Sequence, residues 1–269
     1  MDRKLIALDL DGTTLNNESK ISFKTKEVLK KAEAAGHIVT VVTGRPNRNS
    51  VSYYDELGLT SPMVNFNGAL GHIPHQNWDK EYELTFNKNI AFDILKEKEH
   101  LGIKVIAAEG KNLALADVPN HTLNDYFPNA LKSTEVLNKL NLQQDPTSML
   151  LLVDREKENE IVKALNYNYG DRISVGVWGG PNPILEISPQ GVNKTYGVRY
   201  LAQNYQIERE NIIAFGDEHN DAEMLTYAGW GVAMKNGTEQ IRSLANDVTQ
   251  LDNEHDGMAY YLEDYLNLA

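Results

Sequence analysis

The amino-acid sequence predicts an α/β fold: a doubly wound, mostly parallel, Rossmann-like core sheet with an inserted α+β domain. First, short apolar runs alternate with helical patterns near both ends of the chain, as in βαβ units, which build a parallel sheet with helices on both faces. Second, strand-like runs gather around two helices in the middle, which is typical of an α+β module. We therefore expect a core of residues 1–81 and 188–269 and an inserted domain of residues 82–187.

The core elements follow from apolar runs and from the residues that begin and end helices. The run from Leu5 to Leu8 is too short for a helix and rich in branched residues, so it predicts a buried strand. Ser22 can cap a helix that stops at Gly36. The other core elements expected are strands at 37–42, 63–66 and 212–215, and helices at about 47–57, 194–205 and from 221 toward 228.

The inserted domain is expected to hold two helices and four strands. The helices are placed near 88–101 and 156–166, and the strands at 103–107, 148–153, 172–177 and 184–187. Prolines punctuate the loops between them. Two linkers, near 80–84 and 187–191, would join this domain to the core.

Composition narrows the classes of partner. The net charge of −12 argues against nucleic acid and anionic membranes, which attract basic patches. The chain has no cysteine, so disulfides and thiolate metal sites are excluded. The first apolar run is broken by Asp9 and no run is long enough to span a bilayer, so we expect a cytoplasmic protein without a membrane partner. A monomer or a weak homo-oligomer is expected.

Two aspartates follow the first strand, one residue apart. The period of a strand puts Asp9 and Asp11 on roughly the same side of the chain, where two carboxylates repel unless a proton or a cation lies between them. Gly12 allows a sharp turn directly after them. An Asp-Gly pair alone is more often an ordinary turn, so the rest of the sequence must decide between a turn and a site.

Polar residues at other strand ends favour a site. Thr43 follows the second strand, Asp217 follows the late strand, and Lys194 opens a helix just after the insertion. In a doubly wound sheet these positions meet at the carboxyl edge, where ligands bind. Carboxylate oxygens bind Mg²⁺, whereas a lysine, a hydroxyl and helix N-termini bind phosphate oxygens. The sequence therefore predicts a site for Mg²⁺ and a phosphorylated small molecule.

These motifs together resemble the haloacid dehalogenase-like phosphohydrolases, in particular their Cof-type branch, in which a large cap domain is inserted between the second and third motifs. The resemblance covers essentially the whole chain and makes the inserted domain the cap. The matching segments are Asp9-Leu-Asp11-Gly-Thr-Thr14, Thr43-Gly-Arg45, Gly191-Val-Asn-Lys194, Gly216-Asp217-Glu-His-Asn220-Asp221, Asn67-Gly68-Ala69 and Asp256-Gly257.

The resemblance implies a role for each motif residue. Asp9 would be the nucleophile that forms an aspartyl-phosphate, and Asp11 would be the general acid and base. Mg²⁺ would be held by Asp9, by the main-chain carbonyl of Asp11 and by Asp217. Thr43 and Lys194 would hold the transferring oxygens.

Further positions receive supporting or open roles. Gly44 and Arg45 would line the substrate site, although Arg45 could equally pair with a surface carboxylate. Asn220 would touch the substrate or the metal shell, and Asp221 would fix Lys194 or a metal-bound water. Asn67 would support the site.

Three function classes stay open at this stage. The resemblance favours a Mg²⁺-dependent phosphatase acting on small phosphorylated metabolites, either sugar phosphates or phosphorylated cofactors. A phosphotransferase or phosphomutase with the same aspartyl-phosphate is the alternative. A binding module that has lost the chemistry is the third class, and the intact pair of acids argues against it. His72 and His75 have the spacing of a metal pair, but without a third ligand nearby a structural role is favoured.

Overall fold

The computed structural model describes residues 2–119, 126–130, 132–178 and 182–268, and they form two compact units. Unit 1 comprises Met1–Tyr82 and Asn193–Ala269, and unit 2 comprises Glu83–Val192. Each unit has its own sheet and its own apolar core. The predicted fold class, an α/β core with an inserted α+β domain, is confirmed. Among the described residues, no helix combines the length and the apolar character needed to cross a bilayer.

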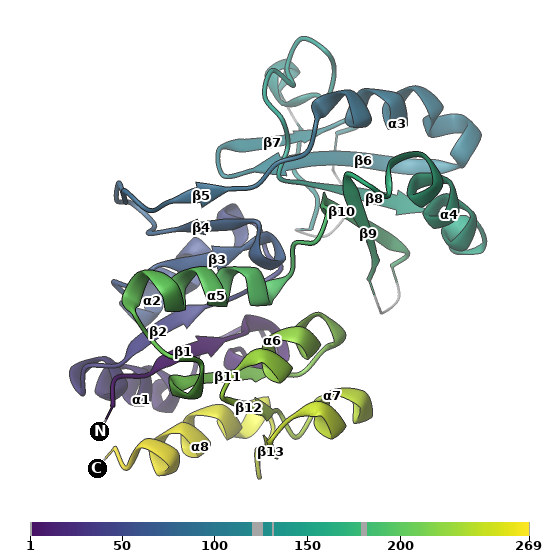
Figure 1. The fold of residues 1–269 in the computed structure, drawn as a ribbon. Coiled ribbons are helices and arrows are strands. Elements are labelled where there is room, and N and C mark those ends of the chain that lie inside the picture. The colour runs from purple at the N-terminus through teal and green to yellow at the C-terminus, as the bar shows by residue number, and fades with distance from the viewer. Residues whose placement is uncertain (1, 120–125, 131, 179–181, 269) are drawn as a thin grey trace. The chain divides into compact units, whose positions relative to one another are not determined.

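Unit 1 is built on a five-stranded parallel sheet (Figure 1). In spatial order its strands are β13 (Asp247–Val248), β12 (Trp230–Ala233), β11 (Ile212–Gly216), β1 (Leu5–Leu8) and β2 (Ile38–Val41). From β1 the chain moves to β2 on one side, and it returns after the insertion to β11 on the other side. The strand order therefore reverses between β1 and β11, and the loops after these two strands flank the position where such sheets bind ligands.

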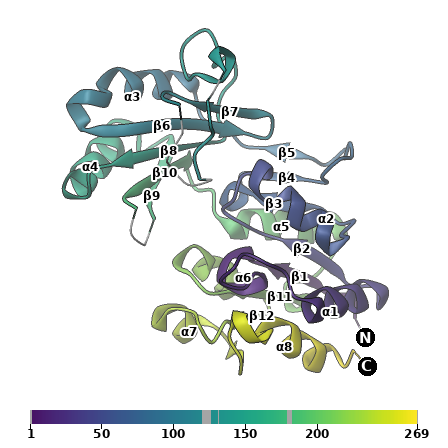
Figure 2. The same cartoon turned by 180° about the vertical axis from the view of Figure 1, so that it is seen from behind.

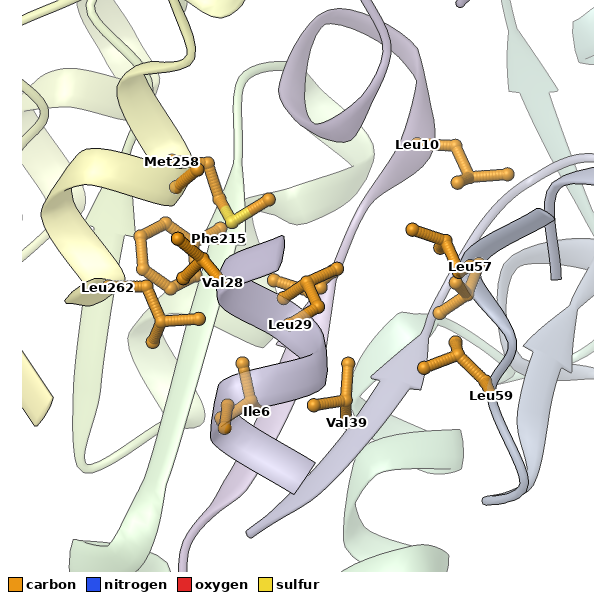
Figure 3. Packing of buried hydrophobic residues seen from close by; sticks show 14 of the residues in the cluster. Ile6, Leu10, Val28, Leu29, Val39, Leu57, Leu59, Phe215, Met258 and Leu262 are labelled. Carbon is orange, nitrogen blue, oxygen red and sulfur yellow. The ribbon is translucent and has the colours of Figure 1, made fainter. Parts of the chain in front are cut away.

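Both faces of the core sheet are covered by helices, which explains why β1 is apolar without alternation. On one face, Ile6 and Leu8 pack with α1 (Phe23–Ala34) and α8 (Gly257–Leu266). Figure 3 shows this layer, in which Val28 and Leu29 of α1 and Met258 and Leu262 of α8 surround the strands. The other face packs against α5 (Lys194–Tyr205), α6 (Ala222–Tyr227) and α7 (Glu239–Leu244).

The segment after β2 differs from its prediction. The single helix expected at about 47–57 is interrupted: a 3₁₀ helix, η2 (Asn47–Asn49), precedes α2 (Val51–Leu57). The break lies at Ser50, whose hydroxyl donates to the Pro46 carbonyl and so competes with helical hydrogen bonding. The chain continues through β3 (Met63–Asn65), η3 (Phe66–Gly68), β4 (Leu70–His72) and β5 (Tyr82–Glu83), of which β4 and β5 were not expected.

Unit 2 holds a five-stranded antiparallel sheet with two helices on one face (Figures 1 and 2). The strands in spatial order are β7 (Leu113–Ala116), β6 (Ile103–Gly110), β8 (Ser148–Val153), β10 (Ile184–Pro189) and β9 (Ile173–Val177), and the helices are α3 (Lys88–Leu101) and α4 (Glu158–Tyr169). Strand β7 was not expected. Because β10 continues to Pro189, residues 188–192 group with unit 2.

Short turns complete the described elements. They are η1 (Leu10–Thr14), η4 (Ser133–Glu135), η5 (Arg155–Lys157), η6 (Arg209–Asn211), η7 (His219–Asp221) and η8 (Asn253–His255). The turn η5 takes the place of the first residues of the helix predicted at 156–166. The turns η1 and η7 lie within three residues of the ends of β1 and β11, and they carry the candidate site residues Asp11, Asn220 and Asp221.

Candidate active site

The turn after β1 brings Asp9 beside the loop after β11. The Asp9 amide donates to the Phe215 carbonyl (3.1 Å), so Asp9 prolongs the sheet before the turn begins. Gly12 has a φ of +70°, and a Cβ there would lie 2.2 Å from Asp217 Oδ2, so only glycine fits. The Thr13 hydroxyl donates to Asp217 Oδ1 (3.1 Å). The turn thus contacts Asp217 in two ways: Gly12 packs against its carboxylate, and Thr13 donates a hydrogen bond to it.

Lys194 is a fully enclosed cation between two carboxylates. It is the first residue of α5, and the side chain of Asn193 caps that helix by accepting from the Tyr196 amide. Its Nζ donates to Asp9 Oδ1 (2.6 Å) and to Asp221 Oδ1 (2.7 Å), and only 1 % of its side chain is exposed. Burial opposes its charge, but Asp221 and Asp9 outweigh burial and raise the pKa of Lys194.

Asp221 ties Lys194 to the loop after β11. Its second oxygen, Oδ2, accepts from the amides of Asp217 (3.0 Å) and Glu218 (3.1 Å), and the side chain is fully buried. Both oxygens therefore have partners within the protein. The sequence left two roles open for Asp221, to fix Lys194 or to fix a metal-bound water. The structure has the contact with Lys194.

Three carboxylates are close enough to share a cation. Asp9, Asp217 and Asp221 each offer an oxygen, and these oxygens lie within 4.8 Å of one another; the side chain of Asp11 is not in this group. Burial and the neighbouring Asp221 raise the pKa of Asp217 to about 7, and burial raises the pKa of Asp9. One lysine faces three carboxylates, and the crowding of their charges adds to burial in raising these pKa values. A divalent cation, which prefers hard oxygen ligands, would relieve that crowding.

The side chain of Asp11 is held by Arg45. Arg45 Nε donates to Asp11 Oδ2 (2.7 Å) and Nη2 donates to Asp11 Oδ1 (2.5 Å), so the pair is bidentate. Of the two roles that the sequence left open for Arg45, this contact is the pairing with a carboxylate. The carboxylate, however, belongs to a candidate site residue. The Arg45 guanidinium also lies 5.2 Å from the centre of the Tyr53 ring.

The remaining predicted site residues gather at the loops after β2 and β3. Thr43 is buried, and its hydroxyl accepts from the Arg45 amide (3.1 Å) while its carbonyl accepts from the Asn67 amide (3.1 Å). Gly44 lies next to the Asn67 side chain. Asn220 Nδ2 donates to Asn67 Oδ1 (3.0 Å), which links this loop to the loop after β11.

A buried polar network behind Arg45 was missed by the sequence analysis. Asn65 Nδ2 donates to the Arg45 carbonyl (2.8 Å) and to the Ser50 hydroxyl (2.8 Å), and His72 Nε2 donates to Asn65 Oδ1 (2.9 Å). In the sequence, this network is indicated only by a polar residue, Asn65, at the end of a buried strand. His75 instead contacts Asp55 (2.9 Å), so the two histidines have different partners. Among the described residues, neither belongs to a group of three metal-ligating side chains.

Comparisons with a family model and with known proteins agree on one family. A family model described as haloacid dehalogenase-like hydrolase matches residues 6–262. A relative from Bacillus subtilis named 5-amino-6-(5-phospho-D-ribitylamino)uracil phosphatase YitU is 36% identical over 269 residues, covering 98% of both chains. A second B. subtilis protein with the same printed activity, YwtE, is 29% identical and covers 98% of both chains.

The fold agrees with that of a solved structure. The structure of TM0651 from Thermotoga maritima superposes with a TM-score of 0.82 at 25% identity and covers 98% of this chain and 97% of its own. The family match spans both segments of unit 1 and the whole of unit 2. The chain therefore belongs to the haloacid dehalogenase-like hydrolases, and it is a phosphatase of that family.

Proposed function

We propose that the protein is a Mg²⁺-dependent phosphatase that hydrolyses small phosphorylated metabolites through an aspartyl-phosphate on Asp9. The observation that carries the proposal is the buried cluster at Asp9, in which one lysine and three carboxylates meet at the reversal of strand order. A neutral ligand would gain little from such charges. A phosphate matches the positive charge of the lysine, and a divalent cation matches the negative charge of the carboxylates.

The proposed reaction has two steps. In the first, an oxygen of Asp9 attacks phosphorus, the bond to the leaving oxygen breaks, and Asp11 gives that oxygen a proton. In the second, Asp11 takes a proton from water, which attacks the aspartyl-phosphate and releases inorganic phosphate. Asp9 is thereby regenerated.

Other residues would orient and neutralise the phosphoryl group. Lys194, which touches Asp9, would hold a non-bridging oxygen, and the Thr43 hydroxyl would hold another. Mg²⁺, bound by Asp9, Asp217 and the Asp11 carbonyl, would screen the charge between nucleophile and phosphate. Asp221 would keep Lys194 in place through its contact of 2.7 Å.

The substrate class is proposed as sugar phosphates or phosphorylated cofactors. Two relatives carry the name of a phosphatase for a phosphoribitylamino-uracil, which supports including that ester among the candidates. Unit 2 is proposed as the cap that sets preference among metabolites, because the residues clustered around Asp9 would contact only the phosphate and the metal.

A screen of phosphorylated metabolites tests the proposal. Purified protein should release inorganic phosphate from at least one ester with added Mg²⁺ and not after chelation. The Asp9→Asn variant, which keeps volume but loses the nucleophilic charge, should be inactive while its unfolding transition persists. Substantial activity of that variant would rule out Asp9 as nucleophile. Transfer of the phosphoryl group to a second sugar with little net phosphate would instead indicate a phosphotransferase or mutase.

A further inference from the structure

The bidentate pair between Arg45 and Asp11 engages both oxygens of the proposed general acid. The two contacts, of 2.7 Å and 2.5 Å, match the fork geometry in which a guanidinium holds a carboxylate most firmly. A carboxyl group that protonates a leaving group needs one oxygen to carry the proton and to reach that group. In the geometry observed, each oxygen already accepts a hydrogen bond from Arg45, and turning either one toward a leaving group would break the fork.

Arg45 is itself fixed in place, so it is the static member of the pair. Its Nη1 donates to the Asn49 carbonyl (3.3 Å), and its guanidinium lies over the Tyr53 ring. Its main-chain carbonyl accepts from Asn65, which is buried. The Asp11 side chain is 56 % exposed, whereas that of Arg45 is 25 % exposed.

We propose that Arg45 is a latch residue: it holds the Asp11 carboxylate away from the reaction, and the pair must open before Asp11 can serve the leaving group. Arg45 is then a positioning residue that acts through Asp11. The inference rests on the proposed function, since it takes Asp11 as the general acid.

The exposure of Asp11 limits the size of the effect. A partly exposed ion pair contributes little to stability, because water competes for both partners. The latch should therefore slow proton donation by a small factor, about twofold to fivefold. A pair this weak would open during each turnover and free Asp11.

A comparison of two esters tests the latch. Para-nitrophenyl phosphate releases an anion that needs no proton, whereas glycerol phosphate releases an alkoxide that does. In Arg45→Gln, the kcat/KM for glycerol phosphate should rise about twofold to fivefold relative to that for para-nitrophenyl phosphate. Arg45→Lys keeps the charge but loses the fork, so its ratio should rise less. Thermal unfolding would verify that each variant is folded.

Two controls separate a latch from other roles of Arg45. Arg48→Gln removes the same charge three positions away, where Nη1 donates to Asn49 Oδ1, and should leave the ratio unchanged. In an Asp11→Asn background, Arg45→Gln should also leave the ratio unchanged, because the group it acts through is gone.

Each alternative result overturns the inference. A falling ratio would mean that Arg45 assists Asp11, and equal losses for both esters would mean that Arg45 binds the phosphate directly. If Arg45→Gln still changed the ratio in the Asp11→Asn background, Arg45 would act through a group other than Asp11. If wild-type protein released phosphate from neither ester nor from any metabolite, the proposed function itself would fail and the latch with it.

Discussion

Lys194 shows how much of the site depends on one buried residue. It lies between Asp9 and Asp221 with almost no exposure, so its removal would leave two carboxylates buried beside each other without a cation. Breaking one side of a buried ion pair costs about 3–5 kcal/mol. We expect Lys194→Met to lower the free energy of unfolding in urea by that amount without added metal, and to abolish phosphate release.

Lys20→Met is the matched control for that prediction. Lys20 also contacts a carboxylate, Glu18, but both side chains are mostly exposed. Water replaces such a partner, so neither stability nor activity should change measurably. A Lys194→Met variant as stable as the Lys20→Met variant would show that the buried contacts of Lys194 do not stabilise the fold.

His37 gives a prediction on pH. It is buried, and its Nδ1 accepts from the Lys4 amide (3.1 Å), which requires the neutral ring. Burial and the nearby Lys4 charge lower the pKa of His37 below 6.5. The unfolded chain then binds a proton that the folded chain refuses, so this contribution to stability is complete above pH 6.5 and is lost as the pH falls toward the folded pKa.

The pH effect is measured as a difference between two proteins. His37→Asn can still accept from the Lys4 amide but does not titrate. Urea unfolding at a series of pH values between neutral and mildly acidic should show a shallower loss of stability for His37→Asn than for the unsubstituted protein. Parallel curves would mean that the proton binding of His37 does not change on folding.

At the scale of elements, the start of α5 positions the site. Asn193 caps this helix, and its carbonyl lies so close to Gly68 that a Cβ there would be 2.1 Å away. Asn193→Ala should cost about 1 kcal/mol through the lost cap. It should also lower kcat, because the helix start carries Lys194. Ser22→Ala, which removes the cap of α1, should cost a similar free energy of unfolding and leave kcat unchanged.

Local signals account for most of the elements. The run Leu5–Leu8 and the cap at Ser22 were placed correctly because burial on both faces and a side-chain oxygen before a helix are local features. The break at Ser50 and the short strand β4 escaped because their local signals are weak. Ser50 bonds the Pro46 carbonyl nearby and also accepts from Asn65, fifteen positions later, whereas β4 has only three residues and pairs with β3. Three residues are too few to show the alternation by which a strand is recognised.

The same limit applies to the site. The sequence pointed to Asp9, Lys194 and Asp217 because each follows a strand or opens a helix at the same sheet edge, and the structure brings all three together. It could not decide the partner of Arg45, since that depends on how the turn after β1 meets the loop after β2. It also gave no sign that Thr13 would hold Asp217.

At the scale of the whole molecule, the division into two units predicts where a metal acts. The three clustered carboxylates all belong to unit 1, so Mg²⁺ should stabilise that unit directly. A ligand at a hundred times its Kd stabilises the state that binds it by about 2.7 kcal/mol. Hydrogen exchange of the intact protein should therefore slow on adding Mg²⁺ in the segments after β1 and β11. The sheet formed by β6, β8 and β10 should exchange as before.

Asp217→Asn supplies the control for this prediction. It removes one ligand charge and keeps the volume, and its amide can still accept from the Thr13 hydroxyl, which is 3.1 Å from Asp217 Oδ1. The variant should lose the Mg²⁺-dependent slowing in unit 1 while keeping the exchange pattern of unit 2. If Mg²⁺ slowed exchange equally in both units of the variant and of the unsubstituted protein, the ion would bind away from the carboxylate cluster. The cluster would then lose its assignment as the metal site.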